Sequence, residues 1–243
     1  MTLRPFFSYY GSKWAAAKRY PAPSGRTLVE PFAGSAGYSL RYPDRAVTLV
    51  ESDPVVAGVW RYLISASAER VRELPDIAPG QDLRKVGGLE ASERNLIGFW
   101  LNRGVSSPRW RLSAWASGKN VSAGNFWGVR ARERIASQLS AIRHWALIEG
   151  DYSAAPEADT TFIDPPYQGR KGEHYIHGSS GLDYASLGAW ARQRRGLVVV
   201  CEAAGARWLP FRSFGDLRAT RGGVSSEVVW LSQNGRGHAA SAV

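Results

Sequence analysis

The residues best suited to chemistry in this chain stand in one short stretch, Asp164-Pro165-Pro166-Tyr167. The apolar run before it predicts a buried strand over 161–164, which the prolines must end because neither can donate to a ladder. Both prolines have a fixed φ, and Asp164 favours extended backbone because it precedes a proline, so the stretch should be stiff. It suits a planar molecule with an amino group: the carboxylate and a carbonyl accept two N–H bonds, and Tyr167 stacks on the ring. A plain Pro-Pro turn with a surface tyrosine is the alternative.

The elements that must position this stretch are expected to alternate between strands and helices. Apolar runs bounded by turn residues predict strands at 27–30, 46–50, 147–149, 161–164 and 197–201. Helical patterns predict helices at 13–20, 54–67, 90–103, 130–145 and 183–195. A further short helix is expected to follow the turn at 31–37 and to end at about residue 41. Two last strands, at about 217–221 and 227–232, are typical of a hairpin around Gly222-Gly223. The pattern predicts an α/β fold with a mainly parallel sheet and an antiparallel C-terminal hairpin.

Small and acidic residues follow two of these strands, at the edge where parallel sheets bind ligands. The turn at 34–37, Gly-Ser-Ala-Gly, opens a helix, and small residues let the backbone approach a ligand closely. Asp53-Pro54 predicts an N-cap followed by proline at the first helical position, so we expect Asp53 to cap. Glu51 is then left to bind ribose hydroxyls, as an acid about twenty residues past a glycine turn can do.

The composition indicates one soluble domain with a sizeable core. The chain has 243 residues, of which 44% are hydrophobic and 21% charged. Its longest aliphatic run, 197–201, is too short to cross a bilayer, and the N-terminus lacks the pattern of a signal peptide, so we expect a cytoplasmic protein. A single cysteine, Cys201, excludes internal disulfides and a cysteine metal cluster. His174 and His177 lie in no HExxH pattern, so no metal is expected.

The net charge of +10 is concentrated between Trp100 and Trp145. One acid, Glu133, stands there among the basic residues Arg103, Arg109, Arg111, Lys119, Arg130, Arg132, Arg134 and Arg143. The same segment holds Trp100, Trp110, Trp115, Trp127 and Trp145, half of the ten tryptophans. Basic groups interleaved with aromatic ones suit a polyphosphate with stackable bases. The alternative is a solvated basic face over buried tryptophans, because tryptophan is most often a core residue.

In combination these motifs resemble the Dam-type DNA adenine-N6 methyltransferases, the D12 class or α group of amino-methyltransferases. Residues 7–13 look like the family's N-terminal cofactor motif, residues 29–35 like its first glycine motif, and Asp164 to Tyr167 like its catalytic signature. The order of these motifs, with the basic segment before the catalytic one, is that of the α group. The chain departs from the family at Ala36, which stands where a second glycine is usual, and at Tyr9, where tryptophan is common.

The resemblance implies a Rossmann-like methyltransferase fold at 1–99 and 146–243, interrupted by an inserted DNA target-recognition segment of helix and loop at 100–145. Catalysis is expected from Asp164, Pro165, Pro166 and Tyr167. The residues expected to bind S-adenosylmethionine are Tyr10, Gly11, Lys13, Glu30, Pro31, Phe32, Ala33, Gly34, Ser35, Gly37, Glu51, Ser52, Asp53, Asp151, Tyr152 and Asp164. Asp151-Tyr152, taken alone, fits a plain turn equally well. The expected DNA contacts are Arg103, Arg109, Arg111, Lys119, Asn125, Arg130, Arg132, Arg134, Lys171 and Tyr175.

The implied reaction is site-specific methyl transfer to N6 of an adenine flipped out of double-stranded DNA. Asp164 and the Pro165 carbonyl would hold the amino group, and the loop 168–182 is expected to close over the base. The resemblance further implies a bacterial or phage-encoded protein, a monomer or weak dimer that needs neither metal nor membrane. An RNA adenine methyltransferase and a catalytically inactive binder of nucleic acid remain alternatives. A small-molecule or protein methyltransferase is least favoured, because it has no use for the basic, aromatic-rich segment.

Overall fold

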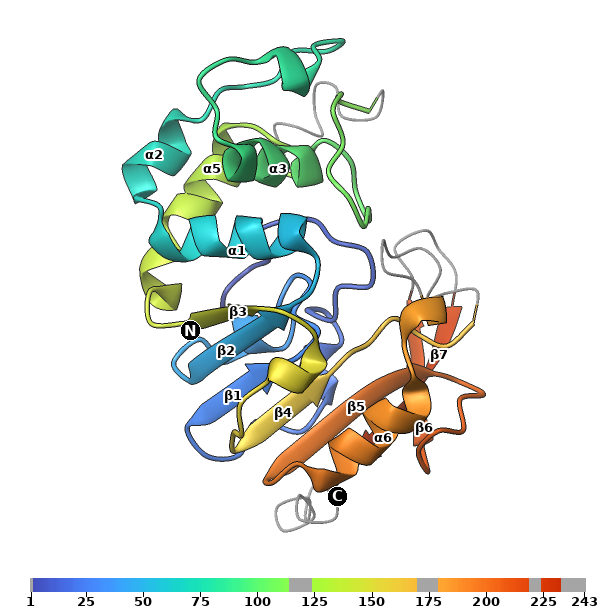
Figure 1. Cartoon of the computed structure of the whole chain (residues 1–243). Helices are drawn as coiled ribbons and strands as arrows, with labels where there is room; N and C mark the ends of the chain where they lie inside the picture. The colour runs from blue at the N-terminus through green and yellow to red at the C-terminus, as the bar shows by residue number, and fades with distance from the viewer. Residues whose placement is uncertain (1, 114–123, 170–178, 219–223, 233–243) are drawn as a thin grey trace.

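One seven-stranded sheet forms the centre of the computed structural model, which describes residues 2–113, 124–169, 179–218 and 224–232 (Figure 1). The strands lie in the order β3-β2-β1-β4-β5-β7-β6. Their bounds are β1 (Thr27–Glu30), β2 (Ala46–Glu51), β3 (Ala146–Glu149), β4 (Thr160–Ile163), β5 (Leu197–Ala203), β6 (Arg212–Arg218) and β7 (Val224–Leu231). Strands β1 to β5 pair in parallel, and β7 is antiparallel to both β5 and β6. The α/β Rossmann-like fold expected from the sequence is confirmed, with its antiparallel C-terminal hairpin.

The strand order reverses between β1 and β4. Successive strands run outward from β1 to β3, and the chain then returns to place β4 on the other side of β1. Sheets of this kind bind ligands at such a switch point, outside the carboxyl ends of the strands. The residues after β1 and β4 therefore lie at the most favourable place for a site.

Two helical layers cover the faces of the sheet (Figure 1). The helix α6 (Tyr184–Gln193) packs Leu187 and Ala191 against Ile163, Val198 and Val200. On the other face, α1 (Pro54–Ser65) and the N-terminal segment bury large side chains such as Trp60 and Phe6 in the main core. None of the described helices is long and apolar enough to cross a membrane.

Three further helices lie beyond α1, at the top of Figure 1. They are α2 (Ala68–Glu73), α3 (Ala91–Trp100) and α5 (Val129–Ala136). Helix α2 contacts α5, and α1 contacts α3. This helical layer therefore includes residues on both sides of position 100, where the sequence places the start of an inserted segment.

Several expected helices are shorter than their patterns suggest. The segment 13–20 forms only the 3-10 turn Ala17–Arg19, and the helix after the glycine turn is the 3-10 turn Ser39–Arg41. The helix predicted at 54–67 ends at Ser65, because Ala66 is extended and Ser67 caps a separate helix, α2. The basic helix predicted at 130–145 ends at Ala136, and just beyond it the side-chain oxygen Oε1 of Gln138 accepts from the backbone amide of Arg4 at 2.6 Å. Other 3-10 turns are Leu83–Lys85, Leu139–Ile142, Tyr152–Ala154 and Ser179–Gly181.

The C-terminal hairpin is longer than expected. Its strands are β6 and β7 at 212–218 and 224–231, against the predicted 217–221 and 227–232. The turn predicted at Gly222-Gly223 lies outside the described residues. Strand β7 inserts between β5 and β6, so residues of β7 lie next to the carboxyl end of β5.

Candidate active site

A cavity of about 600 Å3 lies at the carboxyl ends of β1, β2 and β4. This volume is within the range of small-molecule and cofactor sites. Its wall includes every residue that the sequence assigns to S-adenosylmethionine: Tyr10, Gly11, Lys13, Glu30, Pro31, Phe32, Ala33, Gly34, Ser35, Gly37, Glu51, Ser52, Asp53, Asp151, Tyr152 and Asp164. The wall also includes Tyr9 and Ser12 of the N-terminal motif and Gly181 and Leu182 of the loop expected to close over the base. Ser153, Asp183 and Ser186, which the sequence did not suggest, line it too. The wall thus joins six separate stretches of chain at the switch point of the sheet.

The glycine turn after β1 is braced by Glu51. Gly34 has a φ of +45°, a conformation that favours glycine. Its amide donates to Oε2 of Glu51 at 2.8 Å, and its carbonyl accepts from Nε1 of Trp60 at 2.7 Å. The other oxygen of Glu51 accepts from the Asp53 amide at 2.9 Å. Glu51 therefore fixes the turn, in addition to facing the cavity.

Burial raises the pKa of Glu51 to about 7, against the lowering effect of these amide bonds. Asp53 caps α1 as the sequence predicts, because its Oδ1 accepts from the Val55 amide at 2.8 Å. Asp53 also lines the cavity, as Glu51 does. The two acids differ in their partners, because Asp53 caps α1 and Glu51 bonds the glycine turn.

The N-terminal segment closes on the same turn. A Cβ atom on Gly37 would lie 2.6 Å from the backbone nitrogen of Trp14, so only glycine permits this approach. The hydroxyls of Ser35 and Ser12 are 2.9 Å apart. Ala36, which stands where the family usually has glycine, adopts a φ of +51° and is fully buried. The turn thus keeps a glycine-like backbone at Ala36 despite the side chain.

One side of the cavity is aromatic. The rings of Phe32 and Tyr152 stack with centroids 5.7 Å apart, and Trp190 meets Tyr152 edge-on. Asp151 beside them accepts from the Ser153 amide at 2.7 Å, which closes the 3-10 turn after β3. Asp151 therefore closes a turn, and both Asp151 and Tyr152 line the cavity.

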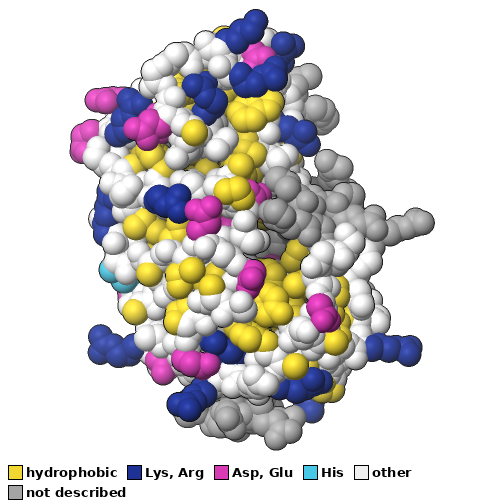
Figure 2. Space-filling view, viewed as in Figure 1, with side chains coloured by type: hydrophobic (Ala, Val, Ile, Leu, Met, Phe, Trp, Pro, Cys, Tyr) yellow, Lys and Arg dark blue, Asp and Glu magenta, His cyan; other side chains and the backbone are white. Residues whose placement is uncertain are grey.

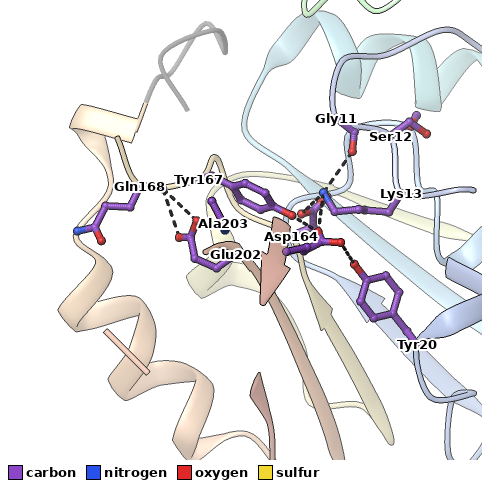
Figure 3. Close-up of polar contacts among 11 residues, drawn as sticks. Gly11, Ser12, Lys13, Tyr20, Asp164, Tyr167, Gln168, Glu202 and Ala203 are labelled. Atoms are coloured by element: carbon purple, nitrogen blue, oxygen red, sulfur yellow. Dashed lines mark hydrogen bonds and ion pairs between the residues drawn. The ribbon is translucent and has the colours of Figure 1, made fainter. Parts of the chain in front are cut away.

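Asp164 lies at the inner end of the cavity beside Lys13 (Figure 3). Nζ of Lys13 is 2.8 Å from Oδ1 of Asp164, and only 9% and 17% of the two side chains are exposed. Oδ1 is itself buried, so the ammonium of Lys13 offsets the cost of burying this carboxylate oxygen. Burial raises the pKa of Asp164 to about 6, although Lys13 lowers it and Glu227 raises it further.

The other residues of the tetrapeptide are held by the scaffold. Pro166 lines the cavity, and its carbonyl accepts from the hydroxyl of Tyr184 at 2.7 Å. Pro165 is buried. The ring of Tyr167 lies over Nζ of Lys13, 4.6 Å from the ring centroid, and its hydroxyl donates to Glu227. Tyr167 is therefore turned toward Lys13 and β7 in this structure.

Two buried acids at this site were not anticipated from the sequence. Glu202, at the end of β5, accepts from the amides of Gln168 and Ala203 and from Nε1 of Trp208 (Figure 3). Glu227, on β7, accepts from Tyr20 and Tyr167 and lies 3.5 Å from Nζ of Lys13. In the sequence each of them is an acid within a valine-rich strand, and this pattern does not indicate which side chains the acid contacts.

The residues predicted to contact DNA differ in exposure where the structure describes them. Arg103, Arg109, Asn125 and Arg130 are exposed. Arg111 is also exposed and lies 3.7 Å from Asp82. Lys119, Lys171 and Tyr175 lie outside the described residues. Figure 2 shows acidic side chains interspersed with Lys and Arg over the helical layer rather than a continuous basic patch on this face.

Two of the predicted arginines are engaged with the protein itself. Arg132 pairs with Asp76 and lies over Trp127, and only 10% of its side chain is exposed. Arg134 lies over Trp100, and its buried Nε has no described hydrogen-bond partner. Burial lowers the pKa of Arg134. Of the tryptophans in the basic segment, Trp100, Trp127 and Trp145 belong to the core, as the alternative interpretation expected.

Comparisons with known proteins add little. No protein-family model and no curated protein matches the chain. It is similar to solved structures of the glycopeptide N-methyltransferase MtfA complexed with (S)-adenosyl-L-methionine and with sinefungin. The sequence identities are 14% and 15%, and the TM-scores are 0.34 and 0.33. Both alignments cover 93% of this chain and 67% of the matched chain. Similarity at this level carries no argument about function, which has to come from the residues of this chain.

Proposed function

We propose that this protein transfers a methyl group from S-adenosylmethionine to N6 of adenine in double-stranded DNA. The observation that supports this most is the cavity, whose wall combines the glycine turn, its bracing acid Glu51 and the carboxylate of Asp164. A cofactor site and an amino-group acceptor therefore share one space. The alternatives in the same class of chemistry are RNA adenine methylation and cofactor binding without transfer.

The chain's own residues fit this cofactor. Gly34 and Gly37 let Tyr9 and the Lys13-Trp14 backbone pack directly against the turn, so that the N-terminal segment and the turn wall the same cavity. The stacked rings of Phe32 and Tyr152 offer a flat apolar wall for a purine. Glu30 and Lys13 line the cavity near the turn, where an acceptor oxygen and a cation suit the amino and carboxylate groups of an amino acid.

The cofactor supplies an electrophilic methyl group on sulfur. With the cofactor bound, the methyl carbon–sulfur bond would break and leave its electron pair on sulfur, a carbon–nitrogen bond would form at N6, and the proton lost from N6 would pass to solvent. Asp164 accepts a hydrogen bond from the amino group through Oδ2, because Oδ1 is already held by Lys13, and thereby orients the nitrogen lone pair. Lys13 holds Asp164 in place through its ion pair with Oδ1.

The target base must leave its helix to reach this buried carboxylate, at a cost of a few kcal/mol. The exposed Arg103, Arg109 and Arg130 are the proposed phosphate contacts, since phosphates dominate affinity for nucleic acids. Arg132 and Arg134 are not among them, because both are engaged within the protein.

Single-turnover labelling tests the proposal. Excess protein is mixed with cofactor carrying a labelled methyl group and with matched DNA duplexes and RNA, and nucleosides are identified by mass spectrometry. We expect label at N6 of adenine in DNA, and none with Asp164→Ala, whose fold and cofactor binding are checked by circular dichroism and calorimetry. Label in RNA alone would favour the RNA alternative. Cofactor binding without any transfer would favour the inactive binder.

A further inference from the structure

Glu227 is an almost fully buried acid that no sequence motif explains. It lies on β7 opposite Ala203 of β5 and Gly215 of β6, and its exposure is 2%. Burying a lone carboxylate is costly, so its partners must offset that cost. Oε2 accepts from the hydroxyl of Tyr20 at 2.7 Å, and Oε1 accepts from the hydroxyl of Tyr167.

Lys13 is shared between Glu227 and Asp164. Its Nζ lies 2.8 Å from Asp164, 3.5 Å from Glu227 and 3.3 Å from the Gly11 carbonyl (Figure 3). An ammonium has three N–H groups, and these three oxygens all lie within 3.5 Å of it. One positive charge thus serves two carboxylates, so Lys13 does not neutralise Asp164 alone.

The same acid fixes Tyr167. The Tyr167 hydroxyl bonds Glu227, and its ring face lies over Nζ of Lys13. A ring that is held at its hydroxyl and at its face has little freedom to turn. Positioning of this kind matters for a side chain beside a reacting amino group, because small displacements there lower the rate strongly.

We propose that Glu227 is a positioning residue of the methyl-transfer site, which orients Tyr167 and, by sharing Lys13, leaves Asp164 an acceptor oxygen for the substrate's amino group. This inference rests on the proposed function. Glu227 acts through Tyr167, Lys13 and Asp164 and need not touch the substrate.

The charge of Glu227 acts on Asp164 together with other groups from every neighbouring element. Lys13 and Tyr20 come from the N-terminal segment, Glu30 from β1, and Tyr167 directly follows the prolines. Cys201 and Glu202 come from β5. Lys13 is the cation that favours ionised Asp164, whereas Glu227 and Glu202 oppose its ionisation.

Two variants separate the two roles of Glu227. Glu227→Gln keeps an acceptor for Tyr167 but removes the charge, so the acid limb of the pH–rate profile should move to lower pH by about one unit. Tyr167→Phe keeps the charge but loses the hydroxyl, so kcat should fall about tenfold or more without movement of that limb. If Glu227→Gln does not fold, Glu227→Asp is used in its place. This variant retains the charge but has a shorter side chain, so it should lose the contact with the Tyr167 hydroxyl and behave like Tyr167→Phe.

A titration of Asp164 decides the question even if no substrate is methylated. Protein with carbon-13 at the aspartate carboxyl groups is titrated by NMR, and Asp164→Asn identifies the Asp164 signal. We expect the midpoint to fall in Glu227→Gln and to stay in Tyr167→Phe. An unchanged midpoint in Glu227→Gln would overturn the shared-charge role, and wild-type kcat in Tyr167→Phe would overturn the positioning of the ring. Absence of methyl transfer by the wild type, with the midpoint shifted, would refute only the proposed function.

Discussion

Arg130 and Arg132, two residues apart on α5, should respond to alanine substitution in opposite ways. Arg132→Ala removes a charged hydrogen bond to Asp76, worth about 1.5–3 kcal/mol, and a cation–π contact with Trp127, worth about 0.5–1 kcal/mol. The Asp76 side chain is 66% exposed, so water replaces part of the lost bond. We therefore expect a loss of about 2 kcal/mol of unfolding free energy, which lowers Tm by about 4–8 °C for a chain of this size.

Arg130→Ala should leave stability within about 0.5 kcal/mol, because the side chain is exposed. If Arg130 contacts a phosphate, its loss removes about one unit from the slope of log affinity against log salt, on every DNA sequence. Arg132→Ala should leave that slope unchanged. The assays are thermal unfolding by circular dichroism and anisotropy of a labelled duplex across a salt series. An Arg132→Ala variant with wild-type Tm and a reduced slope would show that the burial argument is mistaken.

Two further predictions concern the buried acids of the cavity. Asp53→Ala should lower stability by about 1 kcal/mol, as loss of an N-cap does. Glu51→Ala should weaken S-adenosylmethionine binding more than Asp53→Ala does, because it frees the glycine turn. Calorimetric titration of both variants compares their affinities for the cofactor, and weaker binding by Asp53→Ala would contradict this prediction. Burial raises the pKa of Glu30 to about 8, from an ordinary 4.5, so its contribution to stability is complete below about pH 4.5 and is lost as pH rises through about 8. Glu30→Gln keeps an acceptor for the Ser39 amide but does not titrate, so its stability relative to wild type should increase from about pH 5 to about pH 8. Urea unfolding at each pH measures this difference. If stability depends on pH in the same way in both proteins, Glu30 is not buried as a neutral acid.

Local chemistry made much of the fold predictable. Apolar runs and turn residues located the parallel strands, and Asp53-Pro54 located the start of α1, since a cap and its helix are neighbours in sequence. The glycine turn was also recognisable, because close backbone approach needs small residues. These features depend on contacts within a few residues.

The remaining features depend on packing between distant segments. The pattern at 13–20 suggests a helix, but Lys13 and Trp14 lie against Gly37, and only a 3-10 turn forms. Arg130 and Arg132 are the same residue type on the same helix, and only the position of Asp76 makes one of them structural. Glu227 could not be assigned a role, because its partners Tyr20 and Tyr167 come from other parts of the fold.

The contact between Tyr20 and Glu227 joins residues 207 positions apart, and this has a consequence for protein synthesis. A chain leaves the ribosome from its N-terminus, so Lys13, the glycine turn and Asp164 emerge well before β7. Until Glu227 arrives, Lys13 has Asp164 as its carboxylate partner at this site and Tyr167 lacks its anchor. Nascent chains that already carry the cofactor motifs should therefore be poor catalysts, so that activity begins only once β7 has been added to the sheet.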